Sequence, residues 1–521
     1  MNTIKASNPI IWADFPDPDI IRVNDTYYMA STTMHMMPGC AILRSYDLAN
    51  WEIATYVYDT LDGTPGQRLM DDKGIYANGM WAPTFKYHNG KFYIIFVAYD
   101  TQKTYLYTTD NIEGPWKKSH IKGFYHDSSL LFDDDGRVYL IYGNKEIWVI
   151  ELMSDLSGPK DGGIPKLILK DRDDAILGHE GAHIYKINGK YYIFMIHISS
   201  SGNIRRTQCC FVSEKLEGPY VGGDILDDDM GYRNAGIAQG GIIDTPDGDW
   251  YAILFQDHGA VGRIPILIPM HWENDYPVLG VNDKVPFQLS VKSTRAGYQY
   301  APFVGDDDFR YQPLADGKIH LKNYWQWNHE PDDACWSVTE NPGFLRIRTS
   351  DIRTNVVKAK NTLTQRTVGP KCDAIVTLNG EGLNDSDFAG ICVLQSIYGF
   401  IGLTKEEGQY YIVMLGREKS DIIPGQWKKY NDVEPGIEFE RIEIGTSTVE
   451  IKVACFFGEE IDTAEFYFKK HDKWIKLGKT LHLKYTLEQF MGCRFGLAYF
   501  STKREGGYAD FSNFLYNSCV E

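Results

Sequence analysis

Five copies of one short motif constrain the first three hundred residues more than any other feature of the sequence. In each copy Asn or Asp opens a tight turn, and an aromatic strand follows within a few residues. Asn-Gly and Asp-Gly pairs between β-prone runs indicate β-hairpins, because both central residues of a type I′ turn need positive φ. The copies begin at Asn24, Asn89, Asp135, Asn188 and Asp247.

The spacing of these hairpins, 46 to 65 residues, is close to the size of a four-stranded propeller blade. Helical signals are almost absent, because few windows show apolar residues three and four apart without Gly, Pro or Asn between them. The predicted fold class is therefore all-β, with a five-bladed β-propeller over residues 1–310. The alternative is that five such turns are simply what any all-β protein contains.

A chain of 521 residues is too long for one ordinary domain, so we expect a second domain over residues 311–521. Runs such as 389–394 and 449–456 carry β-branched or aromatic residues between turn-forming clusters, which predicts a β-sandwich. The formal net charge of −17 leaves no extended basic stripe and argues against a nucleic-acid partner.

The amino-terminal stretch meets a carboxylate before any apolar run long enough for a signal peptide. No uncharged apolar stretch approaches the roughly 18 residues that a membrane-spanning helix needs. We therefore expect a cytoplasmic protein without a membrane partner. The nine cysteines are odd in number and scattered, which predicts buried free thiols rather than a disulfide framework or a cysteine-based zinc site.

The positions seven or eight residues before each turn carry the candidate chemistry. Equivalent positions on the innermost strands of a propeller converge on the mouth of its central channel. Grouped acids there raise one another's pKa and are costly to desolvate, which favours a functional role. The residues at these positions are Asp17, Trp81, Asp127, Glu180 and Gln239.

Three carboxylates around a channel suit inverting glycoside hydrolysis. One ionised carboxylate activates a water and a protonated one donates to the leaving oxygen, with the pair about 6.5–9.5 Å apart. A third carboxylate beside the general acid would keep the pKa of that acid raised by like-charge repulsion. The ring of Trp81 would pack against a sugar ring. Taken singly, each acid is more readily explained as a turn-former, a strand cap or a surface residue, and it is their shared offset from the turns that favours function.

The same residues resemble glycoside hydrolase family 43, the five-bladed propellers that cleave arabinose and xylose linkages. The resemblance rests on residues 14–20 (DFPDPDI), 45–51 (SYDLANW), 80–83 (MWAP), 127–132 (DSSLLF) and 180–183 (EGAH). It implies that Asp17 is the general base, with Asp14 in reserve, and that Glu180 is the general acid. It also implies that Asp127 tunes the acid's pKa and that Arg263 contacts the sugar.

Beyond residue 315 the chain is similar to the carboxy-terminal, concanavalin-like β-sandwich of xylosidase- and arabinofuranosidase-type members. The stretches that carry this likeness are 325–329 (WQWNH) and 361–366 (NTLTQR). In such members a loop of the sandwich approaches the active site, and residues 499–508 are the segment expected to do so here. A sandwich beside the propeller would narrow the site and favour exo-cleavage.

A histidine that helps hold a metal ion in some relatives is replaced here by Gln239, which we expect to contact substrate. His258, at the end of the same hairpin, is a possible ligand of a structural calcium ion, and a hydrogen-bonded core histidine is the equal alternative. No cofactor is expected for the chemistry itself. His35 is expected among the substrate contacts, although it could also pack within a blade.

The leading functional prediction is an exo-acting, inverting α-L-arabinofuranosidase on oligosaccharides derived from arabinoxylan or arabinan. A β-D-xylosidase is the alternative on the same architecture. A retaining sucrose- or fructan-acting propeller is disfavoured, because its Arg-Asp-Pro and Glu-Cys signatures are missing. A non-catalytic carbohydrate-binding protein is the alternative of another class. It predicts loss of at least one of the three acids, and none is lost. The sequence leaves the oligomeric state open.

Overall fold

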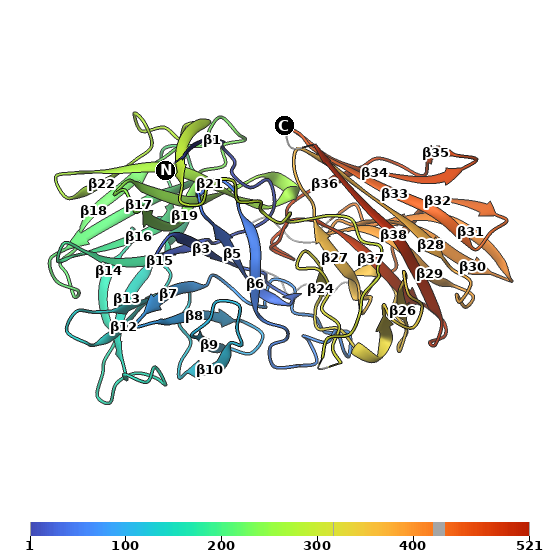
Figure 1. Ribbon diagram of the computed structural model, residues 1–521, viewed down its shortest axis with the longest axis horizontal. Helices are drawn as coiled ribbons and strands as arrows, with labels where there is room; N and C mark the ends of the chain where they lie inside the picture. The colour runs from blue at the N-terminus through green and yellow to red at the C-terminus, as the bar shows by residue number, and fades with distance from the viewer. Residues whose placement is uncertain (1, 316, 420–432, 520–521) are drawn as a thin grey trace.

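The computed structural model describes residues 2–315, 317–419 and 433–519 and is built almost wholly of β-strands. Figure 1 shows two bodies side by side, a propeller formed by the first part of the chain and a sandwich formed by the last. Within these ranges no helix is long and apolar enough to cross a membrane. The helical turns are η1 (Gly259–Val261), η2 (Asp333–Cys335) and η3 (Val356–Lys358).

Five antiparallel four-stranded sheets form the blades, each from a continuous stretch of chain. The first three are β2 (Asp19–Val23), β3 (Thr26–Ser31), β5 (Gly39–Ser45) and β6 (Glu52–Tyr58); β7 (Thr84–His88), β8 (Lys91–Ala98), β9 (Lys103–Thr109) and β10 (Lys117–Ile121); and β11 (Ser129–Phe132), β12 (Val138–Tyr142), β13 (Glu146–Leu152) and β14 (Lys166–Lys170). The last two are β15 (Leu177–Ile187), β16 (Lys190–Ile198), β17 (Arg206–Ser213) and β18 (Val221–Leu226); and β19 (Ala238–Asp244), β20 (Trp250–Asp257), β21 (Arg263–Glu273) and β22 (Tyr276–Leu279).

The first strands of the blades contact one another in a closed ring, because β2 touches both β7 and β19, β11 touches β7 and β15, and β15 touches β19. These strands are therefore the innermost ones. Outside the blades, β1 (Asn2–Ser7) pairs with β23 (Gln288–Ser293) and brings the two ends of the propeller together. The prediction of a five-bladed propeller is confirmed.

The five predicted turns all connect the first and second strands of a blade. Asn89 and Gly90 have φ of 49° and 79°, and Asn188 and Gly189 have φ of 50° and 79°. Such left-handed residues are what a type I′ turn requires, which is why Asn and Gly stand there. The hairpin signal in the sequence therefore reports the true blade periodicity.

Two further sheets of eight strands each form the sandwich. The first contains β4 (Met36–Met37), β24 (Gln326–Asn328), β27 (Leu363–Arg366), β29 (Asp387–Leu394), β30 (Gly399–Glu406), β31 (Gln409–Gly416), β32 (Ile437–Ile444) and β37 (Arg494–Ser501). The second contains β25 (Trp336–Ser337), β26 (Leu345–Arg348), β28 (Lys371–Asn379), β33 (Thr448–Phe457), β34 (Asp462–Lys470), β35 (Lys473–Lys476), β36 (Leu481–Leu483) and β38 (Tyr508–Cys519).

The two domains share a continuous core rather than a thin contact. Strand β4 belongs by sequence to the first blade, yet it pairs with β24 and extends a sandwich sheet. The Arg366 guanidinium lies 4.1 Å from the ring centre of Phe15 and donates a 3.0 Å hydrogen bond from Nε to the carbonyl of Asp14. Because the first blade and the sandwich are fused, a sandwich loop can be held reproducibly over the propeller.

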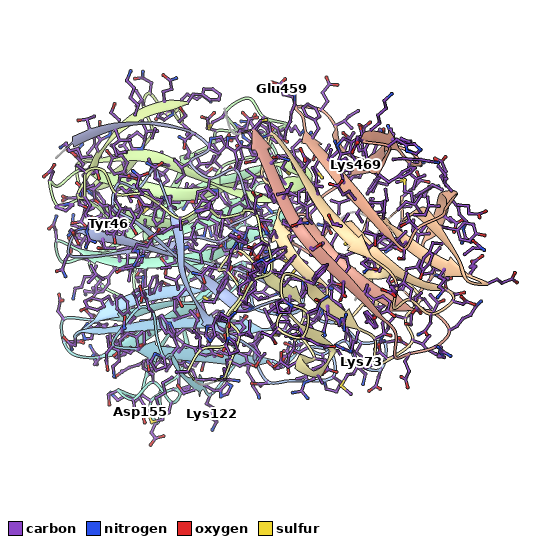
Figure 2. The ribbon with its side chains drawn as sticks, turned by 45° about the vertical axis from the view of Figure 1, so that its right-hand side comes forward. Tyr46, Lys73, Lys122, Asp155, Glu459 and Lys469 are labelled. Atoms are coloured by element: carbon purple, nitrogen blue, oxygen red, sulfur yellow. The ribbon has the colours of Figure 1, made fainter. Side chains whose placement is uncertain are left out.

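The chain between β23 and β24 contains the predicted domain boundary near residue 310 and packs on the first blade. Tyr298 and Tyr300 contact the ring of Tyr46, at centroid distances of 4.6 and 6.3 Å. Tyr46 is labelled on the propeller side of the molecule in Figure 2. The linking segment is thus part of the packed structure.

Candidate active site

The predicted site residues stand where the backbone leaves regular strand geometry. Asp17, Asp127 and Gln239 have φ of 53°, 45° and 66°, and Gly181, directly after Glu180, has φ of 64°. The pairing register also shifts at Glu180 and at Gln239. Bulges of this kind re-aim side chains out of the regular alternation of a strand. At four of the five equivalent positions, Trp81 being the exception, the offset seen in the sequence therefore corresponds to a left-handed residue at or directly after the position.

One side of the site gathers around Glu180. Single ligand atoms of His126, Asp127 and Glu180 lie within 4.8 Å of one another. Asn144 donates a hydrogen bond to Oε2 of Glu180, and Nε2 of His126 lies 3.8 Å from the same oxygen. The amide of Gly181 donates to Oδ2 of Asp127 at 3.2 Å. The structure thus brings the predicted acid and its predicted modulator together, with His126 between them.

The charges in this group perturb one another. Burial raises the pKa of Asp127 well above its usual range, and the charges of Glu180 and Asp17 raise it further, against the opposing effect of His126. Burial alone would lower the pKa of His126, but the surrounding carboxylates outweigh it and raise that pKa to about 9. The raised pKa of His126 favours an imidazolium beside Glu180 at neutral pH.

The opposite side of the site is built around Asp17. Oδ1 of Asp17 accepts a 2.8 Å hydrogen bond from Nη1 of Arg263, and both side chains are buried. Oδ2 of Asp17 receives no hydrogen bond from any residue that the structure describes, which suits a base that takes a proton from water. Asp14 differs, because its two oxygens accept from the amides of Arg263 at 2.8 Å and Gly492 at 2.9 Å. The geometry therefore favours Asp17 over Asp14 as the base.

Aromatic rings wall the space between the two sides. Trp81 lies 5.7 Å from His126 and 5.3 Å from Phe490, measured between ring centroids. The Arg263 guanidinium stacks 4.4 Å above the ring of Phe490. Trp81 is therefore placed as predicted, next to a second ring that comes from the sandwich.

Phe490 was missed by the sequence reasoning, which pointed to residues 499–508 as the approaching loop. That expectation is wrong: Arg504 and Thr502 bond to Asn384 and to the carbonyl of Ser386, within the sandwich. The segment that reaches the propeller lies between β36 and β37 and contains Phe490. Nothing in its local sequence marks it, because the contact joins residues more than two hundred positions apart.

Arg206 is a second residue that the sequence did not single out. It forms an ion pair with Asp257, and its guanidinium lies 5.5 Å from the ring centre of Phe255. Arg263 approaches the same ring at 5.3 Å. Burial and the charge of Arg263 lower the pKa of Arg206, while Glu180 is among the charges that oppose this. Two guanidinium groups therefore line the side of the site formed by the fourth and fifth blades.

Gln239 and the two remaining predicted histidines have different surroundings. Gln239 packs against Gly181, next to the acid, in keeping with its predicted place in the site. His35 is fully buried against Tyr76 and His329, at ring distances of 4.5 and 4.9 Å. That position in the interface between the domains leaves no surface for a sugar, so the structure does not support the predicted substrate contact.

His258 is held by packing rather than by other ligand-type side chains. Its ring stacks on Tyr232 at 3.9 Å, meets Trp12 edge-on at 5.3 Å, and shares a 2.7 Å hydrogen bond with Gln256. Burial lowers its pKa to about 3. In the part of the chain that the structure covers, His258 belongs to no group of acids and histidines able to hold an ion. The predicted role as a calcium ligand stays a prediction.

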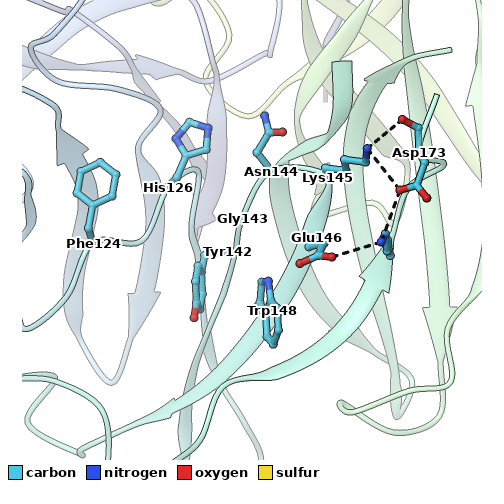
Figure 3. Close-up of a pocket in the computed structure, with 10 residues that line it drawn as sticks. Phe124, His126, Tyr142, Gly143, Asn144, Lys145, Glu146, Trp148 and Asp173 are labelled. Atoms are coloured by element: carbon cyan, nitrogen blue, oxygen red, sulfur yellow. Dashed lines mark hydrogen bonds and ion pairs between the residues drawn. The ribbon is translucent and has the colours of Figure 1, made fainter. Parts of the chain in front are cut away.

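A cavity of about 530 Å³ adjoins the acid side of the site. Figure 3 shows His126 and Asn144 at one end of it and Tyr142 and Trp148 at the other. Phe124 also lines it. Because His126 and Asn144 both touch Glu180, the cavity begins where a protonated leaving group would depart, and its rings offer surfaces on which sugars stack.

Five blades around a channel, the carboxylates of Asp17 and Glu180 with different partners, and aromatic rings between them are the features of an enzyme that hydrolyses glycosidic bonds. The chain belongs to glycosyl hydrolases family 43, whose model matches residues 6–277. Residues 317–517 match the beta xylosidase C-terminal concanavalin A-like domain. The resemblance noted in the sequence, and the concanavalin-like class of the sandwich, are confirmed.

Named relatives differ in the sugar they release. The chain is 27% identical to a beta-xylosidase of Formosa agariphila, with 98% of this chain and 90% of the relative covered. It is 26% identical to a non-reducing end alpha-L-arabinofuranosidase of Bacteroides ovatus, with 74% and 73% covered. A solved structure of a bifunctional GH43-CE protein from Bacteroides eggerthii is 41% identical, with a TM-score of 0.90, over 100% of this chain and 64% of that one.

Proposed function

We propose that the protein is an exo-acting, inverting glycosidase that removes a terminal pentose from xylan- or arabinan-derived oligosaccharides. The main support for the proposal is that the two carboxylates have different partners. Asp17 pairs with Arg263, whereas Glu180 contacts Asn144 and His126. An inverting enzyme needs two carboxylates in such different surroundings, because one takes a proton from water while the other gives one to the leaving oxygen.

In the proposed reaction a water on the Asp17 side attacks the anomeric carbon and loses its proton to Oδ2 of Asp17. Glu180 protonates the glycosidic oxygen, and the leaving sugar departs toward the cavity lined by Tyr142 and Trp148. His126 and Asp127 set the electrostatic environment of the acid. Phe490, from the sandwich, packs against Trp81 and Arg263 in the site, which favours a single terminal sugar over a continuous polymer.

Two sugars fit this scheme, and relatives support each. Most of the named relatives are beta-xylosidases or xylosidase/arabinosidases, which makes a terminal β-D-xylosyl group the first candidate. The arabinofuranosyl group favoured by the sequence reasoning is the second candidate, supported by the Bacteroides ovatus relative. Hydrolysis of 4-nitrophenyl β-D-xyloside and 4-nitrophenyl α-L-arabinofuranoside, measured side by side, separates the two.

Leaving-group dependence tests the acid. Glu180→Gln is expected to lower kcat/KM on a xylose- or arabinose-terminated oligosaccharide by about 10²–10⁴. The loss should be much smaller on the 4-nitrophenyl glycosides, because nitrophenolate departs without protonation. Glu146→Gln is the matched control, since Glu146 lines the same cavity without bonding to Glu180. Equal losses on both kinds of substrate would contradict the role of Glu180.

The stereochemical course tests the whole scheme. Proton NMR during the first minutes of hydrolysis should show the anomer opposite to that of the substrate. Accumulation of the retained anomer would overturn the assignment of Asp17 as a base acting on water. Tight binding of oligosaccharides with no sugar released would instead support the non-catalytic alternative.

A further inference from the structure

A second group of ligand-type side chains lies where the third blade meets the fourth, partly on the strand that carries Glu180. It consists of Asp171, His179 and His197, all of them buried. One ligand-type atom from each lies within 4.8 Å of the others. Asp171 follows β14, His179 stands on β15 directly before Glu180, and His197 stands on β16. None of the three has a role in the proposed reaction.

One oxygen of Asp171 is the meeting point of this group. Oδ1 of Asp171 accepts a 2.7 Å hydrogen bond from the amide of Arg172 and is thereby fixed. Oδ2 lies 3.1 Å from Nδ1 of His197 and 3.7 Å from Nε2 of His179. Two imidazole nitrogens and one carboxylate oxygen therefore converge on a shared space.

The second nitrogen of His197 restricts what can fill that space. Nε2 of His197 lies 2.9 Å from Oδ1 of Asp224, so a neutral imidazole places its proton there. The lone pair of Nδ1 then faces the Asp171 oxygen at 3.1 Å, which is repulsive unless a positive charge lies between them. Either a second proton on His197 or a cation supplies that charge.

His179 distinguishes these two solutions. A proton shared by His197 and the carboxylates satisfies those groups but leaves Nε2 of His179 without a hydrogen bond. His179 is only 5% exposed, and its side chain makes no hydrogen bond to any residue in the described ranges, because its Nε2 lies 3.7 Å from Oδ2 of Asp171, too far for one. A buried imidazole without a hydrogen bond is uncommon, and an ion in the space that it faces would satisfy it. A cation between the three groups would use the nitrogen that faces Asp171.

We propose that Asp171, His179 and His197 bind a divalent transition-metal ion of the zinc type. Ligand atoms about 2.0–2.1 Å from a tetrahedral ion are roughly 3.4 Å apart, and the separations of 3.1 and 3.7 Å bracket that value. Two imidazoles and one carboxylate suit zinc better than calcium, which prefers oxygen ligands. Asp224 then acts as the outer carboxylate that orients a ligating histidine.

Such an ion would clamp the segments that hold the acid. The amide of Asp171 donates to the carbonyl of Lys145 at 2.9 Å, and the amide of Lys145 donates to the carbonyl of His179 at 2.8 Å. The neighbours of Lys145 and His179 are Asn144 and Glu180, which bond to each other. The proposal goes beyond the proposed function, because it concerns metal binding and stability and stands whichever pentose is released.

Metal binding by the full-length chain tests the proposal. Protein stripped with a chelator and dialysed is titrated with ZnCl₂ by calorimetry, and the zinc retained after gel filtration is measured by mass spectrometry. One equivalent is expected. Asp171→Asn and His197→Asn should weaken binding at least 100-fold, and Asp224→Asn, in the outer position, by about 10–100-fold. Zinc should also raise the Tm of the wild type but not that of Asp171→Asn.

The matched control is His271→Asn, which removes a histidine from an exposed pair with Glu273 and should leave zinc binding unchanged. Circular dichroism of each variant shows whether it is folded. If Asp171→Asn and His197→Asn do not fold, zinc binding by Asp224→Asn still tests the proposal. Less than one tenth of an equivalent in the wild type would overturn the proposal and identify His197 as a proton-bridged ion pair. Zinc binding that survives in Asp171→Asn and Asp224→Asn alike would overturn it too.

Discussion

The buried ion pair between Arg263 and Asp17 should contribute measurably to stability as well as to catalysis. The two side chains are 2% and 6% exposed, and their charged atoms are 2.8 Å apart. At an effective dielectric constant near 20, Coulomb's law gives an attraction of about 6 kcal/mol, against which stands a desolvation cost of several kcal/mol for each ion. The net pair is worth far less than the attraction, yet removing one partner leaves the other charge buried and unpaired.

Arg263→Met should therefore lower the free energy of unfolding by about 3–5 kcal/mol. Part of this loss belongs to the stacking of the guanidinium on Phe490, about 2 kcal/mol for a desolvated cation over a ring. Asp17→Asn should cost less, because Asn keeps a polar atom near Arg263. The double variant should be more stable than the sum of the two single losses predicts, by about 1–3 kcal/mol, since neither charge is then left alone.

Urea titrations of the wild type, the two single variants and the double variant, followed by tryptophan fluorescence, measure all four corners of this cycle. A coupling energy within 0.5 kcal/mol of zero would refute the reasoning, since it would mean that Arg263 and Asp17 contribute independently. Arg22→Met with Asp244→Asn is the matched control. That pair is partly exposed and should show a coupling below about 1 kcal/mol.

Three other perturbations follow from the same geometry. Phe490→Ala should raise KM about 10–100-fold with a smaller change in kcat, because the ring walls the bound sugar beside Trp81; an unchanged KM would contradict this. Gly181→Ala should lower the Tm by a few degrees, since φ is 64° there and the new Cβ would lie 2.8 Å from the side chain of Gln239; circular dichroism melting measures it, and no change would count against the strained geometry. The raised pKa of His126, about 9, predicts that kcat/KM falls as pH rises through 9 and the imidazolium is lost; that limb should be absent from the pH profile of His126→Asn.

The sequence predicted the propeller, and it singled out the carboxylates that lie together in the site, because both depend on local patterns. A two-residue turn such as 188–189 constrains its own backbone, and the offset from that turn fixes where Glu180 enters the innermost strand. Phe490 and the structural role of Asp14 could not be found in this way. The amide of Gly492 that binds Asp14 stands at the other end of the chain. Such contacts follow from how two domains pack, and no local pattern records that.

His35 shows the opposite error. It precedes a short segment, β4, that looks like part of a blade, and a histidine near a channel is a plausible sugar ligand. The structure instead pairs β4 with β24 of the sandwich, which carries His35 into the interface beside His329. Whether a loop residue of a blade faces the channel or the neighbouring domain therefore depends on which distant strand its segment pairs with.

The left-handed backbone at the site residues links the fold to the chemistry. For residues other than glycine this conformation costs roughly 1–2 kcal/mol each, so glycine would be the stable choice at Asp17, Asp127 and Gln239. The fourth blade shows that solution, since Gly181 takes the left-handed position and Glu180 stands one residue earlier. At Asp17, Asp127 and Gln239 the side chain of the left-handed residue itself lies in the site, so the backbone strain is retained there. Four of the blades therefore share one backbone feature, and among them only Glu180 has its side chain one residue before the left-handed position, beside Asn144 and His126.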